Sequence, residues 1–495
     1  MRINKVATKY LAVSAILVLL ASSFAGLALK SSNPFKPTKK LGATSIAGYY
    51  NQNFNWNECY GGFKCATFKV PIDYDNIDLG ELDIAVMKHE SSEAIGNLVV
   101  NPGGPGGSGV DYVYSYASAF TDVINRRFNI VGFDPRGVGR SAPIECLTNS
   151  ETDEAYASNA YPSNEAEVAL FEAESAAFAE KCTESNKYLA FDSTANAAKD
   201  MDILRALLGD KKLNYLGKSY GTYLGTLYAK FFPDKVGRFV LDGAVDPTLK
   251  SSAQTLQQAV GFDLAFKSFA EDCMKLTSCV FSGDFVTQME SKLADLRKEP
   301  VVIGDRKLTE SLAMYGIAFG LYDQEYGWPL LRNSLKDLFN GDGKALLEMA
   351  DQYTGRDNNG NYANNEAASL TVIACNDFPP SGIDLEATKE AAPLFGKYVV
   401  YAEIDCKYLP KPKYELIDAP IDLKSTALVI GTTNDPATPY QWAVKLSEVL
   451  RNSKLISVSG DGHTGYNRGS QCVDQIVEKY LISGVIPAQN LACSA

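Results

Sequence analysis

The sequence predicts an α/β fold in which a mostly parallel central sheet is flanked by helices and carries a mostly helical insertion. Short apolar runs alternate with stretches of helical periodicity along most of the chain, which is typical of this architecture. One run leads through Gly217-Lys218-Ser219-Tyr220-Gly221 directly into a helix, as in a tight strand–turn–helix connection. The chain has 495 residues, 46% hydrophobic and 21% charged, enough for one large elaborated domain or two to three smaller ones.

The strands of the predicted sheet are apolar runs, taken here in chain order. We expect the first four strands at 65–70, 82–87, 97–100 and 128–133. An amphipathic helix over 194–208 precedes strand 213–216, which delivers Ser219 to the following helix at 220–232. A further strand is expected at 238–241, and the last two at 427–430 and 455–458.

Two stretches interrupt this alternation. Residues 145–186 are acidic and rich in alanine, which favours a helical excursion from the core. Residues 251–418 form a longer, mostly helical insertion after strand 238–241, in the position of a lid. We therefore expect a core in two parts, 46–250 and 419–495, separated by a helical lid over 251–418.

The N-terminus has the features of a targeting segment. Arg2, Lys5 and Lys9 precede an uncharged, mostly apolar run over 10–29, and Ser23-Phe24-Ala25 fits the small-x-small rule for cleavage. We expect a signal peptide over 1–25 and a linker over 26–45. The alternative is an uncleaved membrane anchor that ends at about residue 29, because roughly 20 uncharged residues could just span a bilayer.

The ten cysteines of an exported chain predict disulfides. Their spacing suggests sequential pairing: Cys59–Cys65, Cys146–Cys182, Cys273–Cys279, Cys375–Cys406 and Cys472–Cys493. With no CxxC pair and no HExxH, we expect no metal and no cofactor. We expect a secreted or cell-surface protein, and the absence of Asn-x-Ser/Thr favours a bacterial over a eukaryotic secretory origin. The net charge of −12 argues against nucleic acid as a partner.

The chain has only two histidines, and one follows a predicted strand in Gly462-His463-Thr464-Gly465. A serine hydroxyl needs a base within hydrogen-bond reach, and that base needs an orienting carboxylate. We expect Ser219 as nucleophile, His463 as base and Asp435, just past strand 427–430, as the acid. The order Ser, Asp, His is that of an α/β-hydrolase. Asp242, which follows strand 238–241, is the competing acid.

A glycine-rich loop over 101–109 follows strand 97–100, where such hydrolases form half of the oxyanion hole. Only glycine leaves backbone N–H groups uncovered enough to approach a developing oxyanion. We expect the N–H of Gly104 to act with the N–H of Tyr220. Nucleotide binding is the alternative for such a loop, but there is no P-loop lysine and its prolines remove donors.

Together, the GGPGG loop, Asp134-Pro135-Arg136-Gly137 and the Gly-Lys-Ser-Tyr-Gly-Thr turn resemble the group of proline iminopeptidases and secreted tripeptidyl aminopeptidases. The resemblance runs from about Trp56 to Cys493 and is nearest to the tripeptidyl branch. It implies the triad above and an exopeptidase acting on peptides with a free N-terminus. The iminopeptidases carry a histidine before GGPG, where this chain has Pro102, so strict prolyl specificity is in doubt.

An aminopeptidase must hold a cationic amine, which carboxylates do best. Asp377 and Glu366, in the matching lid segment, are the candidates, and solvated or helix-capping acids are the alternative. Four aromatic residues recur in the lid at helical spacing, as core packing or as a hydrophobic substrate wall: Tyr315, Phe319, Tyr322 and Tyr326.

The predicted function is that of an exported serine aminopeptidase with peptide substrates and no membrane contact beyond a possible N-terminal anchor. One alternative is an exported carboxylesterase with the same triad. Another is a catalytically inactive hydrolase fold that serves as a binding module, although such a copy has no need of all four catalytic elements.

Overall fold

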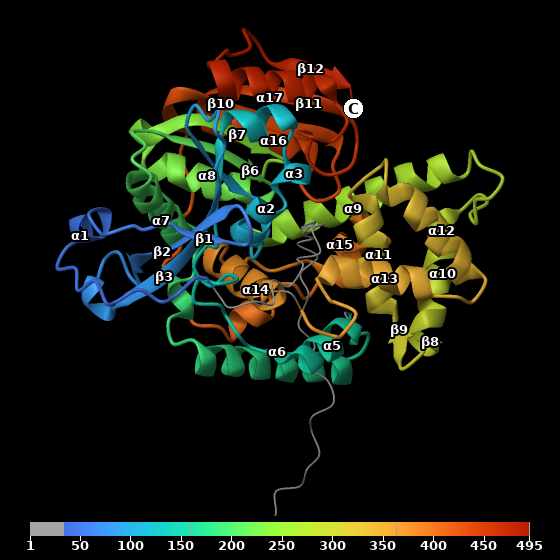
Figure 1. Cartoon of the computed structure of the whole chain (residues 1–495). Helices are drawn as coiled ribbons and strands as arrows, with labels where there is room; N and C mark the ends of the chain where they lie inside the picture. Colours follow the sequence, from blue (N-terminus) through green and yellow to red (C-terminus); the bar gives the residue numbers. More distant parts are fainter. Residues whose placement is uncertain (1–33, 160, 363, 495) are drawn as a thin grey trace, which may run out of the picture.

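The structure is a computed structural model that describes residues 34–159, 161–362 and 364–494 (Figure 1). The predicted signal peptide, the alternative membrane anchor and the first part of the linker lie outside the described residues. Within the described ranges, no helix is both long enough and apolar enough to cross a membrane.

The described chain is built around one sheet, which has ten strands in the order β1-β2-β3-β5-β4-β6-β7-β10-β11-β12. The pairs β1–β2, β2–β3 and β3–β5 are antiparallel, and every other pair is parallel. The strands are β1 (Asn57–Cys59), β2 (Phe63–Pro71), β3 (Glu81–His89), β4 (Asn97–Asn101), β5 (Asn129–Phe133), β6 (Leu213–Lys218), β7 (Val236–Asp242), β10 (Ile421–Asn434), β11 (Leu450–Asp461) and β12 (Leu491–Ser494). The predicted fold class, a mostly parallel sheet with flanking helices, is confirmed.

Each expected strand is present, but the prediction that 455–458 is the last strand is wrong. β12 adds a further parallel strand at the edge of the sheet, where Ile456 pairs with Leu491. Its four residues are too few to show an apolar run, and the Cys472–Cys493 disulfide ties it to α17 (Gln471–Ser483). The pairing is therefore supplied by tertiary contacts that carry no local sequence signal.

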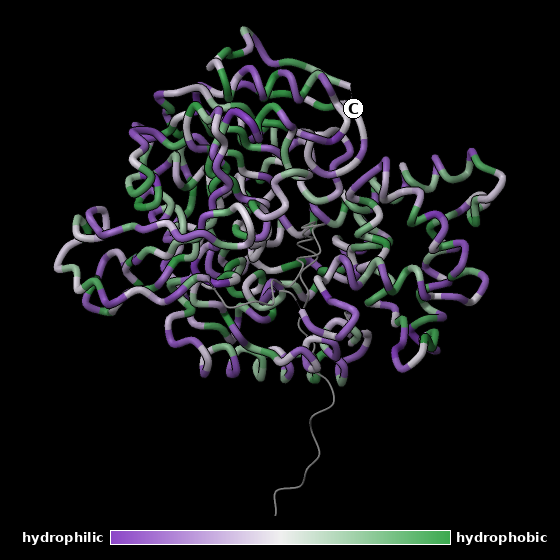
Figure 2. Tube along the Cα trace, viewed as in Figure 1, coloured by the Kyte–Doolittle hydropathy of each residue, from purple (hydrophilic) through white to green (hydrophobic). Residues whose placement is uncertain are grey.

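Alternate residues of the central strands face two hydrophobic layers. Val99 packs with the helices of one face, while its neighbours Leu98 and Val100 pack with those of the other. The first face is covered by α7 (Thr194–Leu207), α8 (Tyr220–Phe231) and α16 (Tyr440–Val449), and the second by α2 (Gly109–Tyr114), α4 (Asp122–Arg127) and α17. Figure 2 shows hydrophobic segments along the central strands.

The long insertion between β7 and β10 is mostly helical and has its own hydrophobic core. Helices α9 to α13 extend to the right of the sheet in Figure 1, whereas α14 lies between the sheet and α6. The insertion contains α9 (Ser251–Cys273), α10 (Phe285–Lys298), β8 (Val301–Ile303), β9 (Arg306–Leu308), α11 (Glu310–Leu321), α12 (Gly327–Phe339), α13 (Lys344–Thr354), α14 (Glu366–Asp377) and α15 (Leu385–Ala391).

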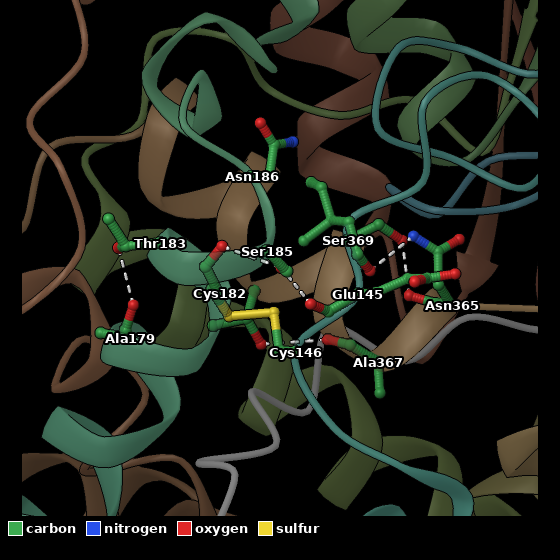
Figure 3. The surroundings of a disulfide bond; sticks show 12 residues. Glu145, Cys146, Ala179, Cys182, Thr183, Ser185, Asn186, Asn365, Ala367 and Ser369 are labelled. Carbon is green, nitrogen blue, oxygen red and sulfur yellow. Dashed lines mark hydrogen bonds between the residues drawn. A yellow bond between two sulfur atoms is a disulfide. The ribbon is translucent and has the colours of Figure 1, made fainter.

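The second, smaller helical segment, the predicted excursion over 145–186, lies against the start of α14 (Figure 3). It consists of α5 (Asn149–Ala157) and α6 (Glu165–Ser185), closed by the Cys146–Cys182 disulfide. Figure 3 shows this disulfide beside Asn365, Ala367 and Ser369 at the first turn of α14. The Asn365 amide donates to the Ile144 carbonyl at 2.9 Å, so the residue just before the excursion is bonded to the start of the helix. All five predicted disulfide pairs are present.

Candidate active site

Ser219 occupies a sharp turn between β6 and α8. Its backbone has φ 54° and ψ −127°, a region that side chains other than glycine rarely adopt. The turn is possible because Gly217 and Gly221 have no Cβ at positions where backbone or side-chain atoms of their neighbours lie close. A Cβ at Gly217 would lie 2.4 Å from the Gly221 carbonyl oxygen, and one at Gly221 would lie 2.8 Å from Asn101 Oδ1. The two glycines therefore let the strained serine project from the carboxyl edge of the sheet.

His463 and Asp435 meet in the loops that follow β11 and β10. His463 Nδ1 lies 2.8 Å from Asp435 Oδ1 and 2.9 Å from Oδ2. The carboxylate also accepts the N–H groups of Ala437, Thr438 and Thr464, at 2.9, 2.8 and 3.2 Å. These donors fix the orientation of a carboxylate that is only 2% exposed. Since Nδ1–H donates to the carboxylate, Nε2 is left as the basic nitrogen.

Asp242, the competing acid, holds the backbone of the histidine loop instead of the imidazole. Its two carboxylate oxygens accept the N–H groups of Gly465 at 2.8 Å and Tyr466 at 2.9 Å. Burial raises the pKa of this carboxyl. From the neighbouring strand end, Lys218 Nζ donates to the Tyr466 carbonyl at 2.9 Å, and burial lowers the pKa of that ammonium to about 8. The two acids therefore have different partners: Asp435 bonds the imidazole, and Asp242 bonds the backbone of the loop that carries it.

The glycine-rich loop lies directly against the serine turn. A Cβ at Gly103 would be 2.8 Å from the Lys218 carbonyl oxygen and 2.9 Å from Ser219 Cβ. The Gly103 N–H is already used, because it donates to Asn101 Oδ1 at 3.0 Å. Within the described chain, by contrast, the N–H groups of Gly104 and Tyr220 donate to no protein acceptor. These two donors remain available to a ligand beside Ser219.

The two predicted amine-binding acids stand at opposite ends of α14 and are not brought together. Eleven residues of helix at 1.5 Å each separate them by about 16 Å. Glu366 lies beside the glycine-rich loop, since a Cβ at Gly106 would be 3.2 Å from Glu366 Cγ. Asp377 is buried and accepts from Thr194 N–H at 2.8 Å and from the Thr194 hydroxyl. Burial raises the pKa of Asp377 to about 7.

Two cavities open at the predicted catalytic residues. A small one of about 40 Å³ adjoins Ser219 and is lined by uncharged residues only: Gly104, Pro105, Ser219, Tyr220, Tyr223, Val245, Gln254, Gln258, Ala374, Phe378, Thr438 and Trp442. A larger one of about 740 Å³ adjoins His463 and is lined mainly by polar residues: Ser118, Tyr322, Asp323, Gln324, Glu325, Tyr326, Asp461, Gly462, His463, Thr464, Asn467, Arg468 and Gly469.

The four lid aromatics serve both packing and cavity lining. Tyr315 and Tyr322 are buried in the lid core, as the packing interpretation expects. Tyr322 also contacts His463, because its carbonyl accepts the His463 N–H at 2.9 Å and its ring meets the imidazole edge-on at 5.2 Å. Phe319 and Tyr326 line a further cavity of about 340 Å³, and Tyr326 is 68% exposed.

The sequence did not predict two contacts of the site, one from the Thr438 side chain and one from the Tyr322 backbone. Thr438 Oγ1 donates to Asp435 Oδ2 at 3.0 Å, lies 3.3 Å from His463 Nδ1 and also lines the cavity at Ser219. Its position three residues after Asp435 was a usable signal, because such residues commonly bond an Asp side chain. The contact from Tyr322 comes from the lid and has no local signal. Among the described residues, no cluster of His, Cys, Asp and Glu has the arrangement of a metal site.

Comparison with known proteins identifies the family. The serine protease Hip1 of Mycobacterium tuberculosis is 36% identical over 464 residues, covering 88% of this chain and 88% of that protein. Carboxylesterase B of the same organism is 34% identical over 452 residues, covering 87% of this chain and 86% of the relative. A tripeptidyl aminopeptidase of Streptomyces coelicolor is 29% identical over 486 residues, covering 91% and 88%. The predicted resemblance to the tripeptidyl aminopeptidase group is confirmed. The model of the alpha/beta hydrolase fold matches residues 96–467, and the chain belongs to this family.

Proposed function

We propose that this protein is an exported serine aminopeptidase that releases tripeptides or other short N-terminal pieces from peptides with a free N-terminus. The observation that carries the proposal is the convergence of a strained serine, an Asp-bound histidine and two uncommitted N–H groups at one edge of the sheet. Thr438 links them, because it contacts the His463–Asp435 pair and lines the same cavity as Ser219, Gly104 and Tyr220.

In the proposed mechanism Ser219 Oγ attacks the scissile carbonyl while His463 Nε2 takes the hydroxyl proton. Asp435 holds the imidazole and stabilises its positive charge. The oxyanion of the tetrahedral intermediate accepts hydrogen bonds from the N–H groups of Gly104 and Tyr220. His463 then gives the proton to the leaving amine, and the C–N bond breaks to leave an acyl-enzyme on Ser219. Water, activated by His463, releases the N-terminal piece and regenerates the serine.

We propose that the lid limits the acyl side of the site, as an exopeptidase requires. We propose the division into a core of 46–250 and 419–495 and a lid of 251–418, with α14 crossing the acyl side of the site. Glu366, next to the oxyanion loop, is the acid that we propose for the substrate amine, since a carboxylate and an ammonium form a charge-assisted hydrogen bond. Asp377 already accepts hydrogen bonds from Thr194, so we do not propose it for the substrate amine. The relative named a tripeptidyl aminopeptidase supports this activity.

Export is supported by five disulfides, which form and persist in oxidising compartments. We propose that residues 1–25 direct the chain to a secreted or cell-surface location in a bacterium. Peptides are the proposed partners, and the reaction requires no metal or cofactor.

A carboxylesterase is the second candidate function. It is favoured by the uncharged lining of the small cavity at Ser219 and by the relative named carboxylesterase B. The aminopeptidase and the carboxylesterase would use the same chemistry at the serine. They differ in that only the aminopeptidase needs an acid that binds a substrate amine. An inactive binding module is disfavoured by the retention of every catalytic element.

The test uses protein lacking residues 1–25, with Ser219→Ala as control. Both are incubated with unblocked and N-acetylated copies of the same peptides, and the products are read by mass spectrometry. Tripeptides released only from unblocked peptides, and only by the unmodified protein, are the expected result. Hydrolysis of simple esters with no cleavage of any peptide would replace the aminopeptidase with the esterase.

A further inference from the structure

The cavity beside His463 has a charge pattern that the proposed catalysis does not use. We propose that it binds the segment of the peptide that leaves, and that it favours a lysine or arginine in the first residues after the scissile bond. This inference rests on the proposed aminopeptidase function and names the substrate class that the site prefers.

The cavity lies between the lid and the histidine loop. The residues after α11, at 323–326, form one wall, and the loop after β11, at 461–469, forms the other. Its volume of about 740 Å³ falls within the ordinary range for ligand sites, so it has room for peptide side chains. By comparison, the cavity of about 40 Å³ at Ser219 has room only for a small group.

The position of the imidazole assigns this cavity to the leaving segment. His463 lines it, and Nε2 is buried with no hydrogen-bond partner among the described residues. The base of a serine peptidase gives its proton to the amine that leaves, so that amine must lie within hydrogen-bond reach of Nε2. The chain that follows the amine therefore starts at the His463 side and continues into the larger cavity.

The walls carry three carboxylates and one guanidinium. Arg468 pairs with Asp323 at 2.9 Å, which neutralises one of the acids. Among the described residues, the Asp461 carboxylate accepts only from the neutral amide of Asn434, at 3.1 Å. In the described chain neither Asp461 nor Glu325 forms an ion pair. Two negative charges are thus left without a protein cation, and a lysine or arginine of the substrate would supply one.

The charge preference should be confined to the leaving side. The small cavity at Ser219 is lined by no charged side chain, and on the acyl side the carboxylate that we propose, Glu366, is assigned to the N-terminal amine and not to a substrate side chain. A glutamate just after the scissile bond would be repelled by Asp461 and Glu325. The effect is moderate and depends on salt, because both acids are partly or fully exposed to solvent.

The test compares peptides with a free N-terminus and identical first three residues, followed by lysine, glutamine or glutamate. We expect kcat/KM at low ionic strength to favour lysine over glutamate by about tenfold, and about 1 M salt to reduce the ratio to near twofold. The double substitution Glu325→Gln/Asp461→Asn should bring the ratio near unity. The matched control, Glu180→Gln/Glu184→Gln on α6, removes two charges far from the cavity and should keep the preference.

Each ratio is internal to one enzyme preparation, so partial misfolding of a variant does not affect it, and the salt dependence is measured on the unmodified protein. Equal cleavage of the lysine and glutamate peptides would overturn the inference, as would a preference that survives Glu325→Gln/Asp461→Asn. So would a variant that loses its discrimination against N-acetylated peptides, because the cavity would then bind the N-terminal amine. Cleavage of no peptide at all would overturn the proposed function itself.

Discussion

Replacing Asp435 with asparagine should abolish most turnover, whereas the same change at Asp242 should leave most of it. Both acids follow neighbouring parallel strands and both are buried, but they contact different parts of the histidine loop. Asp435 lies 2.8 and 2.9 Å from His463 Nδ1. Asp242 contacts only the N–H groups of Gly465 and Tyr466 from that loop.

The expected magnitudes follow from these contacts. An asparagine at 435 cannot stabilise the imidazolium and favours the wrong tautomer, and such a change lowers kcat about 10,000-fold in a Ser-His-Asp enzyme. That loss corresponds to about 5.4 kcal/mol of transition-state stabilisation. An asparagine at 242 replaces one carboxylate oxygen with an NH₂ group, so two donors face each other where a hydrogen bond was. The change costs about 1–3 kcal/mol of folding free energy. Its effect on kcat should stay within about tenfold, since His463 keeps its partner.

The assay is steady-state cleavage of one unblocked peptide by the two variants, together with urea unfolding of each. The expected pattern is a large loss of kcat with Asp435→Asn and a mainly structural loss with Asp242→Asn. If Asp242→Asn were the more damaging to kcat while remaining folded, Asp242 would be the catalytic acid and our assignment would be refuted.

Three further changes test the surroundings of the site. Gly103→Ala should lower kcat at least 100-fold, because the new Cβ would lie 2.9 Å from Ser219 Cβ. Gly62 is the control: its φ is similar, but a Cβ there would have no atom within 4 Å, so Gly62→Ala should affect only stability. Asp377→Asn should flatten the fall in stability as pH rises. The pKa of this carboxyl is about 7 in the folded protein and ~3.9 in the unfolded chain. Its contribution to the free energy of unfolding is therefore full below pH ~4 and is lost as the pH rises to 7, at up to ~1.4 kcal/mol per pH unit. Urea unfolding at several pH values measures this, and an unchanged slope would contradict it. Cys146→Ser with Cys182→Ser opens a loop of 36 residues and should cost about 3–4 kcal/mol in chemical unfolding, and an unchanged midpoint would count against this estimate.

Much of the fold could be predicted because its strands are buried on both faces. Such strands contain continuous apolar runs, as at 98–100 and 427–430, and a glycine-rich turn follows the first of these. β12 could not be predicted, because its four residues depend on pairing with β11 and on a disulfide for their place in the sheet.

The site shows the same division between local and long-range information. Ser219, Asp435 and His463 each follow a strand, so sequence order and topology were enough to nominate them. The lid residues were harder, because their partners are far away in the sequence. Asp377 bonds Thr194, 183 residues away, and shares only a helix with Glu366. The Tyr322 carbonyl that accepts the His463 N–H is also far away in the sequence, and it is a backbone group, which no side-chain pattern could reveal.

The most direct test of the proposed catalysis is to trap the acyl-enzyme. Protein lacking residues 1–25 is mixed with an activated ester of an unblocked tripeptide, quenched in acid during the first turnover and weighed intact by mass spectrometry. We predict a mass increase equal to the tripeptidyl group, located by digestion on Ser219 and absent in Ser219→Ala. Turnover of the ester with no adduct on Ser219, or with an adduct on another residue, would contradict the central claim.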